Sequence, residues 1–579
     1  MKKFILTFAL LLSGITLCFA DFVGKDQVNE IAKKWFSSEN FTVTLDESST
    51  LYYVNATDGG WIIISAEDST TPVIGYSDTG SIDPNKMPSH VKYFMGSYSK
   101  SIDAVRDANL QANPTVKKLW RSAGIRTKAT GGKLLNTASW DQDEPYNLFC
   151  PEVVESGRKY TALTGCVATS AAIILRYHRW PEKGKGTIGG YSYKSDYNKN
   201  ITIPAYSIDD HVYDYDLMPL SYTKSATKAQ KEAVSLLMHD LGVMFQANYN
   251  YQTGTGAYAE DIQKALFEHM GYSGKAYHLY RNACSDAEFL KIMKAEIDAD
   301  RPIPYGGSDP QNGGHQFLCD GYDAKDYIHI NWGWSGDSNG YFTLTLNVPQ
   351  QFTFSESQSI LVGLEPDRDG STSNNGGPLV LLYDKSLAAY KGIAVTGGSI
   401  ESKVFELKVG AIYNTDMNTF YKGKIRMALV DYTGKVKEVI SSEEEHTFED
   451  SEIKGIASIK CKVSADYCLG DRIVAQYIAK GGEWEDIKCH TEFATFPNGI
   501  AVIDTPFIRI EDSYSAGDSF YIEIIPGNSL VSSYTWSFDG LTQKHASVCP
   551  LTAGTHVVKA KVTLKNGSSY VLTQKINVN

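Results

Sequence analysis

One cysteine of this chain stands where a nucleophile could be activated. Cys166 opens an Ala- and Leu-rich run that is expected to be helical, and Gly165 before it gives the chain room to turn. At a helix N-terminus, unpaired N–H groups and the helix dipole favour a thiolate. By itself, a cysteine in such a place is more often a small buried apolar residue. Cys166 therefore needs a partner before chemistry can be assigned to it.

A histidine that could act as the general base must come from elsewhere in the chain. His178 lies about twelve residues further along the predicted helix, roughly 18 Å away, and is interpreted as a packing or surface residue. His315 follows two glycines and begins an alternating segment that is predicted to be a strand. It comes about 150 residues after Cys166, which is within the spacing typical of papain-like enzymes.

Two further side chains could support this pair. The side-chain carbonyl of Asn331 could accept a hydrogen bond from an imidazole N–H and fix its orientation, as in Cys–His–Asn sites. Trp332 and Trp334 could shield that bond from water, although ordinary core packing also explains them. Gln142 offers an amide donor that, with the Cys166 backbone N–H, could hold a tetrahedral oxyanion. Together these residue types indicate acyl transfer through a thiol.

The elements that must position these residues are preceded by a targeting segment. Residues 1–20 have a charged start, an apolar run over 4–12 and a small-x-small exit at Ala20, as in a secretory signal peptide. The apolar run is much shorter than the roughly 20 residues that span a membrane. We expect export with cleavage after Ala20; release and surface attachment both remain open.

Residues 21–130 are expected to form a small α+β unit. Apolar residues recur at helical spacing over 28–36, and strand-type runs cover 51–54 and 61–64. The stretch from Arg121 to Lys133 has Gly, Arg and Lys residues and no apolar periodicity. It is predicted to be an exposed linker, where proteolytic nicking is expected.

The rest of the chain divides by composition. Residues 131–366 combine helical patterns with Gly-rich loops, and 367–378 have linker composition. Strand-type runs separated by turns then cover 405–412, 425–431, 473–478, 521–525 and 556–564, which favours β-sandwich domains over 379–499 and 500–579. No chemistry is evident there, so binding, spacing or surface retention is the expected role of these two domains.

Composition and charge exclude several classes of protein. The 579 residues are enough for about three to five domains, and 42% hydrophobic with 21% charged residues is typical of globular protein. A net charge of −12 without basic runs argues against nucleic-acid or anionic-membrane binding. Nine cysteines are too few for a disulfide scaffold, and no CxxC pair indicates zinc. Whether the last four cysteines pair is open.

At these motifs the sequence resembles the streptopain family of secreted bacterial cysteine peptidases, including its interpain-type members. The matching stretches lie within residues 134–366 and read LLNTASWDQDEPYNL (134–148), TGCVATSAAIILRYHRWP (164–181), YDYDLMP (213–219), GGHQFLCDGYD (313–323) and INWGWSG (330–336). Residues 21–130 fit the family's inhibitory prosegment by position more than by motif. The C-terminal β region has no clear counterpart in the shortest members.

The resemblance implies a papain-like catalytic domain and synthesis as a zymogen. It assigns Cys166 as nucleophile, His315 as general base and acid, Asn331 as the residue that orients His315, and Gln142 as oxyanion donor. Trp332, Trp334 and Gly314 would shield the site or line the substrate cleft.

One departure from the family pattern concerns specificity. Family members tend to prefer a hydrophobic residue two positions before the scissile bond. Gln316 replaces the small residue that often follows the histidine, which would narrow a neighbouring subsite.

The sequence thus predicts an α+β protein: a papain-like domain between an α+β prosegment and all-β C-terminal domains. Its predicted function is that of a secreted cysteine endopeptidase that needs no metal or organic cofactor. The expected partners are protein and peptide substrates and its own prosegment as an intramolecular inhibitor, with no nucleic acid and no transmembrane segment. The alternatives are a papain-like cell-wall peptide hydrolase or amine transferase, and a non-catalytic surface adhesin.

Overall fold

The computed structural model describes residues 22–578 with gaps, the longest of which are 125–131, 347–357, 371–378, 383–391, 415–420 and 491–498. The predicted signal peptide lies outside the described residues. The chain divides into two compact units, residues 1–128 with 345–354 and residues 129–344 with 355–579, and each is considered by itself. In the described part of the chain, no helix combines the length and the apolar character needed to cross a membrane.

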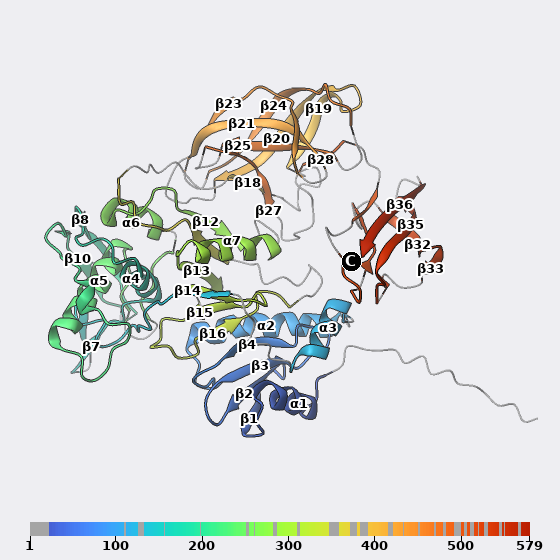
Figure 1. The fold of residues 1–579 in the computed structure, drawn as a ribbon. Coiled ribbons are helices and arrows are strands. Elements are labelled where there is room, and N and C mark those ends of the chain that lie inside the picture. The colour runs from blue at the N-terminus through green and yellow to red at the C-terminus, as the bar shows by residue number, and fades with distance from the viewer. Residues whose placement is uncertain are drawn as a thin grey trace, which may run out of the picture. The chain divides into compact units, whose positions relative to one another are not determined.

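The first unit is a small α+β fold (blue in Figure 1). Its strands pair antiparallel in chain order, β1 with β2, β2 with β3 and β3 with β4. Its elements are α1 (Lys25–Phe36), β1 (Phe41–Leu45), β2 (Leu51–Ala56), β3 (Trp61–Ser65), β4 (Val73–Ser77), α2 (Ser89–Asp107) and α3 (Pro114–Ser122).

The predicted elements of this unit are confirmed. The apolar residues of α1 at helical spacing, among them Val28 and Ala32, are buried, so this face of the helix packs into the core. β3 is buried at every position, because Ile62, Ile63 and Ile64 leave no polar face for solvent.

The predicted linker from Arg121 to Lys133 is shorter than expected. Helix α3 continues to Ser122, and β5 (Gly132–Leu134) already pairs with β14 (Gly313–Asp323). Gly132 has a φ of 108°, and a Cβ there would overlap the carbonyl oxygen of Tyr322, so this strand pairing requires glycine. Residues 125–131, the centre of the predicted linker, lie outside the described residues.

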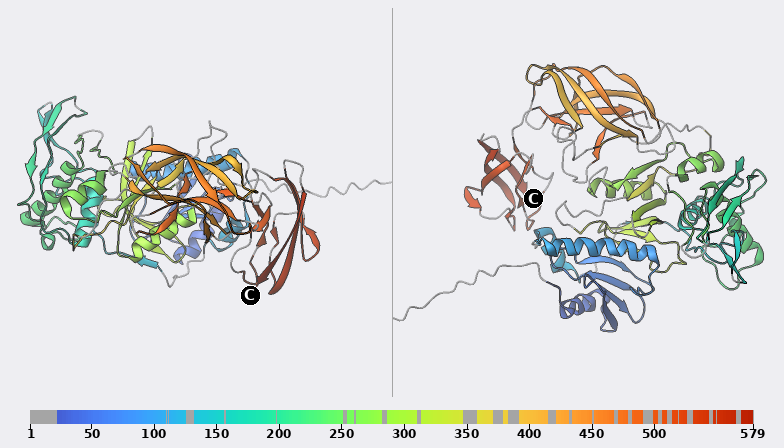
Figure 2. Two further views of the ribbon diagram at one scale, coloured as in Figure 1. Left: turned by 90° about the horizontal axis from the view of Figure 1, so that it is seen from above. Right: turned by 180° about the vertical axis from the view of Figure 1, so that it is seen from behind.

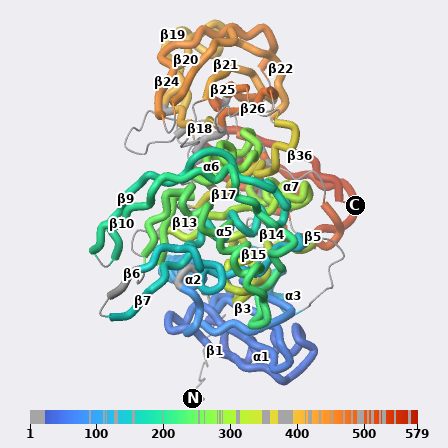
Figure 3. The backbone as a smooth tube through the Cα atoms, turned by 90° about the vertical axis from the view of Figure 1, so that its left-hand side faces the viewer, coloured from blue at the N-terminus to red at the C-terminus, as the bar shows by residue number. Residues whose placement is uncertain are grey.

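The second unit begins with a mainly helical part. Its elements are the hairpin β6 (Glu152–Glu155) and β7 (Arg158–Thr161), α4 (Cys166–His178), β8 (Thr187–Ile188), the hairpin β9 (Tyr191–Lys194) and β10 (Asn200–Ile203), β11 (Tyr206–Ser207), the 3₁₀ helix η1 (Tyr215–Leu217), α5 (Lys228–Met244) and α6 (Asp261–Met270). The β9–β10 hairpin lies at the edge of this part (Figure 3).

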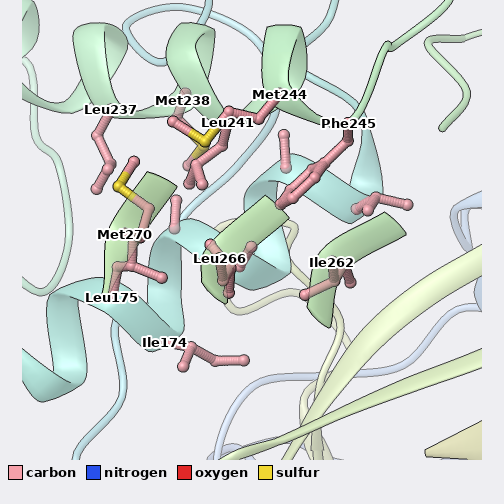
Figure 4. Packing of buried hydrophobic residues seen from close by; sticks show 14 of the residues in the cluster. Ile174, Leu175, Leu237, Met238, Leu241, Met244, Phe245, Ile262, Leu266 and Met270 are labelled. Atoms are coloured by element: carbon pink, nitrogen blue, oxygen red, sulfur yellow. The ribbon is translucent and has the colours of Figure 1, made fainter. Parts of the chain in front are cut away.

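Helix α4 lies at the centre of this part. All residues from Val167 to Leu175 are buried, because small and apolar side chains surround the helix rather than forming one stripe. Figure 4 shows side chains of α4, α5 and α6 gathered in one core, among them Leu175, Leu241 and Leu266. This packing fixes the helix that begins at Cys166.

A mainly antiparallel sheet follows. Its strands lie in the order β16-β15-β14-β13-β17-β12, with β5 also paired to β14. Its elements are β12 (Tyr277–Tyr280), α7 (Asp286–Asp298), β13 (Ile303–Asp309), β14, β15 (Ile328–Asn331), β16 (Gly340–Phe342) and β17 (Ser359–Val362). The predicted strand at His315 is therefore confirmed as β14, and it occupies an interior position in the sheet.

The first C-terminal region has two sheets over a shared core (Figure 2). Its strands are β18 (Leu379–Leu382), β19 (Ile393–Ser399), β20 (Val404–Asn414), β21 (Tyr421–Val430), β22 (Val436–Val439), β23 (Glu444–Phe448), β24 (Ile453–Lys462), β25 (Arg472–Ile478), β26 (Trp484–Asp486), β27 (Lys488–His490) and β28 (Ile500–Ala501). Leu407 of one sheet and Met427 of the other both have fully buried side chains in that core.

The second C-terminal region is also built from strands and has a separate core around Phe520 and Trp536. Its strands are β29 (Phe507–Arg509), β30 (Phe520–Tyr521), β31 (Glu523–Ile525), β32 (Val531–Phe538), β33 (Leu541–Gln543), β34 (Ser547–Val548), β35 (Gly554–Leu564) and β36 (Ser569–Val578). The predicted boundary after residue 499 is slightly wrong, because β28 pairs with β25 and Val502 belongs to the core of the first region.

Candidate active site

Cys166 is the first residue of α4, as predicted. The preceding Gly165 has a φ of 88°, and a Cβ there would lie 3.0 Å from both the carbonyl oxygen and the methyl group of Thr255. Glycine is therefore required both for the conformation and for the close approach. Cys150, Cys319 and Cys461 are buried free thiols, whereas the Cys166 side chain is only partly buried.

Two opposing effects act on the pKa of the Cys166 thiol. Burial raises its pKa, while the backbone N–H groups of Gln316, Cys166 and Val167 lower it, and the net shift is upward. The N–H groups of Cys166 and Val167 at the helix start favour the thiolate, as expected, but burial has the larger effect.

His315 lies near the start of β14, opposite Gly307 of β13. Because the N–H of the next residue, Gln316, interacts with the Cys166 thiol, the strand that carries His315 passes beside the start of α4. Burial lowers the pKa of His315. Burial therefore favours the uncharged form of both groups in this structure.

A small pocket lies between α4 and the sheet. It is lined by Cys166, Thr169, Ser170 and Ile173 of α4, by Gln316, Phe317 and Leu318 of β14, and by Asn331, Trp332 and Gly333. The fold thus brings together three of the predicted site residues, Cys166, Asn331 and Trp332, from segments far apart in the sequence.

Asn331 ends β15 and is buried. Its Nδ2 donates to the carbonyl oxygen of Ala138 at 2.9 Å and to Thr137 Oγ1 at 3.3 Å, and its Oδ1 accepts from the Gly333 N–H at 3.2 Å. These hydrogen bonds do not include His315. The structure places Asn331 in the pocket, and its orienting role stays a prediction.

The two tryptophans and Gly314 have different surroundings. Trp332 is fully buried; its Nε1 donates to the Ser338 carbonyl at 2.9 Å, and its ring lies 4.8 Å from that of Phe317. Trp334 is half-buried, and Gly314 is exposed, where a Cβ would make an ordinary contact with the Gly307 carbonyl oxygen at 3.6 Å. Of these three residues, Trp332 lines the pocket.

Gln142 is buried close to the start of α4. Its backbone carbonyl accepts from the Thr164 N–H at 3.0 Å, two residues before Cys166. The neighbouring Asp141 accepts from the Gln142 N–H at 2.8 Å and from Ser335 Oγ at 2.7 Å. The Gln142 segment is therefore tied both to the cysteine turn and to the loop after Asn331.

His178 is a packing residue, as interpreted from the sequence. Its Nδ1 lies 3.0 Å from the Tyr272 hydroxyl, and burial lowers its pKa to about 4.

Sequence reasoning missed a hydrogen-bonded group beside Asn331. Thr137 bonds to Asn331 and also donates to Asp320 Oδ2, while His329 Nδ1 lies 2.5 Å from Asp320 Oδ1. The three residues come from three segments, so no spacing rule connects them. The only available signal was that all three lie within or next to the stretches that carry the family resemblance.

Comparison with known proteins places the site within a family. Residues 140–342 match the Peptidase C10 family, and residues 20–102 match the Spi protease inhibitor family. The thiol protease/hemagglutinin PrtT of Porphyromonas gingivalis is 27% identical over 412 residues, a match that covers 66% of this chain but 46% of PrtT. This chain therefore spans about half the length of that relative.

Shorter relatives are covered more fully. Streptopain of Streptococcus pyogenes is 30% identical over 345 residues, which is 55% of this chain and 81% of streptopain. Among solved structures, a prointerpain A fragment of Prevotella intermedia is 26% identical with a TM-score of 0.46, covering 56% of this chain and 98% of the fragment. Active interpain A is 28% identical with a TM-score of 0.35, covering 41% and 96%. The extent of the streptopain match, together with the family match across the pocket residues, shows that the chain belongs to the Peptidase C10 family of cysteine peptidases.

Proposed function

We propose that this protein is a secreted endopeptidase, made as a zymogen, that cleaves proteins through Cys166 and His315. The observation that carries the proposal is the meeting of the α4 N-terminus with β14, where the Gln316 N–H interacts with the Cys166 thiol. The residue before Gln316 is the histidine that the chemistry requires. Asn331 and Trp332 line the same pocket as Cys166.

The proposed reaction has two steps. The Cys166 thiolate forms a bond to the substrate carbonyl carbon, and the resulting oxyanion is held by the Cys166 N–H and the Gln142 amide. The His315 imidazolium then protonates the departing amine nitrogen as the C–N bond breaks. Water attacks the thioester and His315 accepts its proton; the C–S bond then breaks, the carboxylic acid product leaves, and the Cys166 thiolate and His315 imidazolium are regenerated.

The match to an inhibitor family supports synthesis as a zymogen. Residues 20–102 match the Spi protease inhibitor family. We propose that residues 21–130 are the inhibitory prosegment. Cleavage between Arg121 and Lys133, in the part that remains a predicted linker, would release it.

The remaining regions receive proposed roles from their sequence and fold. The pattern of residues 1–20 supports secretion. The β regions over 379–502 and 506–578 have separate cores and contribute no residue to the pocket in the part of the chain that the structure describes. We assign them to binding or retention at the cell surface.

The test compares residues 21–579 as wild type and as Cys166→Ala. We expect the wild type alone to trim itself near residues 121–133, observed by gel and N-terminal sequencing, and to hydrolyse casein after trimming. If limited trypsin yields a trimmed wild type that hydrolyses peptidoglycan fragments but not casein, the cell-wall alternative replaces this proposal. Equal casein hydrolysis by both proteins would overturn the assignment of Cys166.

A further inference from the structure

The amide group of Asn331 has a defined orientation in this structure. Both of its nitrogen hydrogens are used, one by the carbonyl of Ala138 and one by Thr137 Oγ1. Its oxygen faces the other way and accepts from the Gly333 N–H. Because a carbonyl oxygen has two lone pairs, the Asn331 oxygen can take one more donor.

The bond from Asn331 to Thr137 is oriented by a buried carboxylate. Asp320 is almost fully buried, and a carboxylate only accepts hydrogen bonds. The single hydroxyl hydrogen of Thr137 goes to Asp320 Oδ2, so Thr137 Oγ1 must act as an acceptor toward Asn331. His329 Nδ1, 2.5 Å away, occupies Asp320 Oδ1 as the donor. The direction of each bond therefore follows from the carboxylate.

The backbone places Asp320 where this arrangement requires it. The pairing of β14 with β15 shifts register between Cys319 and Gly321, so Asp320 is the extra residue of a β-bulge. A bulge redirects a side chain that regular alternation would point elsewhere. The Asp320 carbonyl also accepts from the Leu135 N–H at 2.8 Å, which fixes the segment that carries Thr137.

We propose that Thr137, Asp320 and His329 are positioning residues that present the Asn331 carbonyl oxygen to the His315 imidazole. The proposal rests on the proposed function and on the role that the family resemblance gives Asn331, that of orienting His315. The arrangement joins the three segments that carry Gln142, His315 and Asn331, because Thr137 precedes Gln142, Asp320 shares β14 with His315, and His329 shares β15 with Asn331. Other titratable side chains of the segments around it are Cys166, Asp141, Cys319 and Asp323 of β14, and Tyr341, whose ring lies 4.9 Å from that of His329.

The test uses Thr137→Val, which keeps the shape and removes the hydroxyl, with Thr137→Ser as the matched control that restores it. Asp320→Asn is a second variant, because its amide can donate to Thr137 and reverse the bond direction. Each is made in the activated protein and in the Asn331→Ala background. The measurements are kcat and KM on a peptide substrate, the pH dependence of kcat/KM, the pH dependence of Cys166 alkylation by iodoacetamide, and the melting temperature.

We expect Thr137→Val and Asp320→Asn to lower kcat by about three- to tenfold with little change in KM, as loss of one hydrogen bond would. The basic limb of both pH profiles should move to lower pH, because an imidazolium without an oriented acceptor loses its proton more easily. Thr137→Ser should behave like the wild type. In the Asn331→Ala background the variants should add nothing further, since coupled residues are not additive.

Full additivity with Asn331→Ala, or a lower melting temperature with unchanged pH profiles, would refute the positioning role. Alkylation does not depend on peptide hydrolysis. If the wild type cleaves no protein or peptide but Thr137→Val still shifts the alkylation profile, the proposed function fails while the positioning role stands.

Discussion

Two buried carboxylates of the second unit make similar hydrogen bonds in different places. Asp240 of α5 accepts from His211 Nδ1 at 2.7 Å and from the hydroxyls of Tyr206 and Tyr213 at 2.8 Å each. Asp320 of β14 accepts in the same way from His329 Nδ1 and from the hydroxyl of Thr137.

The difference lies in what their partners contact next. Tyr206, Tyr213 and His211 belong to the helical part and do not line the pocket that contains Cys166. Thr137 bonds to Asn331, which does line it. The same chemistry is therefore expected to stabilise the fold at Asp240 and to orient a catalytic group at Asp320. The position of a buried carboxylate in its network, rather than its burial, indicates which role it has.

The largest expected effect is that of replacing Cys166, whose pocket distinguishes the two carboxylates. Cys166→Ala should lower peptide hydrolysis by at least about a thousandfold, as loss of a nucleophile does, while leaving the fold intact. Hydrolysis of casein and the circular dichroism melting curve measure the two effects. Unchanged hydrolysis would mean that this pocket is not the active site. The two carboxylates would then not differ in their relation to catalysis.

Gly165→Ala tests how the turn before Cys166 affects both the stability of the protein and catalysis. Its φ of 88° and the contact with Thr255 both oppose a Cβ, so the turn before Cys166 must shift. We expect a loss of about 1–3 kcal/mol of stability and a fall in kcat of at least about tenfold. Gly256→Ala is the matched control, because its φ is not in the left-handed region and a Cβ there meets open space, and it should change both quantities little. Equal behaviour of the two variants would contradict the geometry of the turn.

Asp240→Ala tests the carboxylate that we expect to stabilise the fold rather than to orient a catalytic group. It leaves the buried hydroxyls of Tyr206 and Tyr213 without their acceptor, so we expect a loss of about 2–4 kcal/mol in the free energy of unfolding. The kcat per titrated active site should stay within about twofold of the wild type. Chemical denaturation and active-site titration measure these effects. A fall in kcat like that of Asp320→Asn would mean that the two carboxylates do not differ in role.

The smallest effect is a pH dependence of stability. Burial by itself would raise the pKa of Asp240, but the His239 imidazole 3.6 Å away and hydrogen bonds from His211, Tyr206 and Tyr213 lower it below its usual value. A carboxyl whose folded pKa is lowered stabilises the protein above its unfolded pKa of about 4, and this stability is lost as the pH falls through the folded pKa. As the pH decreases below about 4, the melting temperature should fall. Asp240→Asn should reduce the slope of this fall. An identical slope in the variant would argue against the network.

Much of the fold follows from local sequence patterns. Helix α4 and the strands β2, β3 and β14 lie where apolar spacing and turn residues predicted them, because short-range patterning decides which face of an element is buried. The ends were less predictable. Arg121–Ser122 and Gly132–Lys133 look like linker, but the first pair extends α3 and the second forms a strand with β14. That strand exists only because a partner from 190 residues later in the chain lies beside it.

The residue types of the candidate site were predictable from the sequence, but the direction of the Cys166 pKa shift was not. Residue chemistry and family resemblance selected Cys166, His315, Asn331 and Gln142, and the structure places Cys166 and Asn331 in one pocket. The sequence favoured a thiolate from the helix N-terminus. The balance between that helix and burial depends on what surrounds the sulfur, which sequence patterns do not contain.

The sequence by itself predicted the nucleophile and the order of the regions and carried the family resemblance, because each motif consists of residues that are close together along the chain. Only the tertiary structure decided the direction in which the Asn331 amide points. That direction depends on a bulge at Asp320 and on hydrogen bonds among Thr137, Asp320 and Asn331, which come from three separate segments. Hydrogen-bond direction is set by contacts in space, and these residues become neighbours only when the chain has folded.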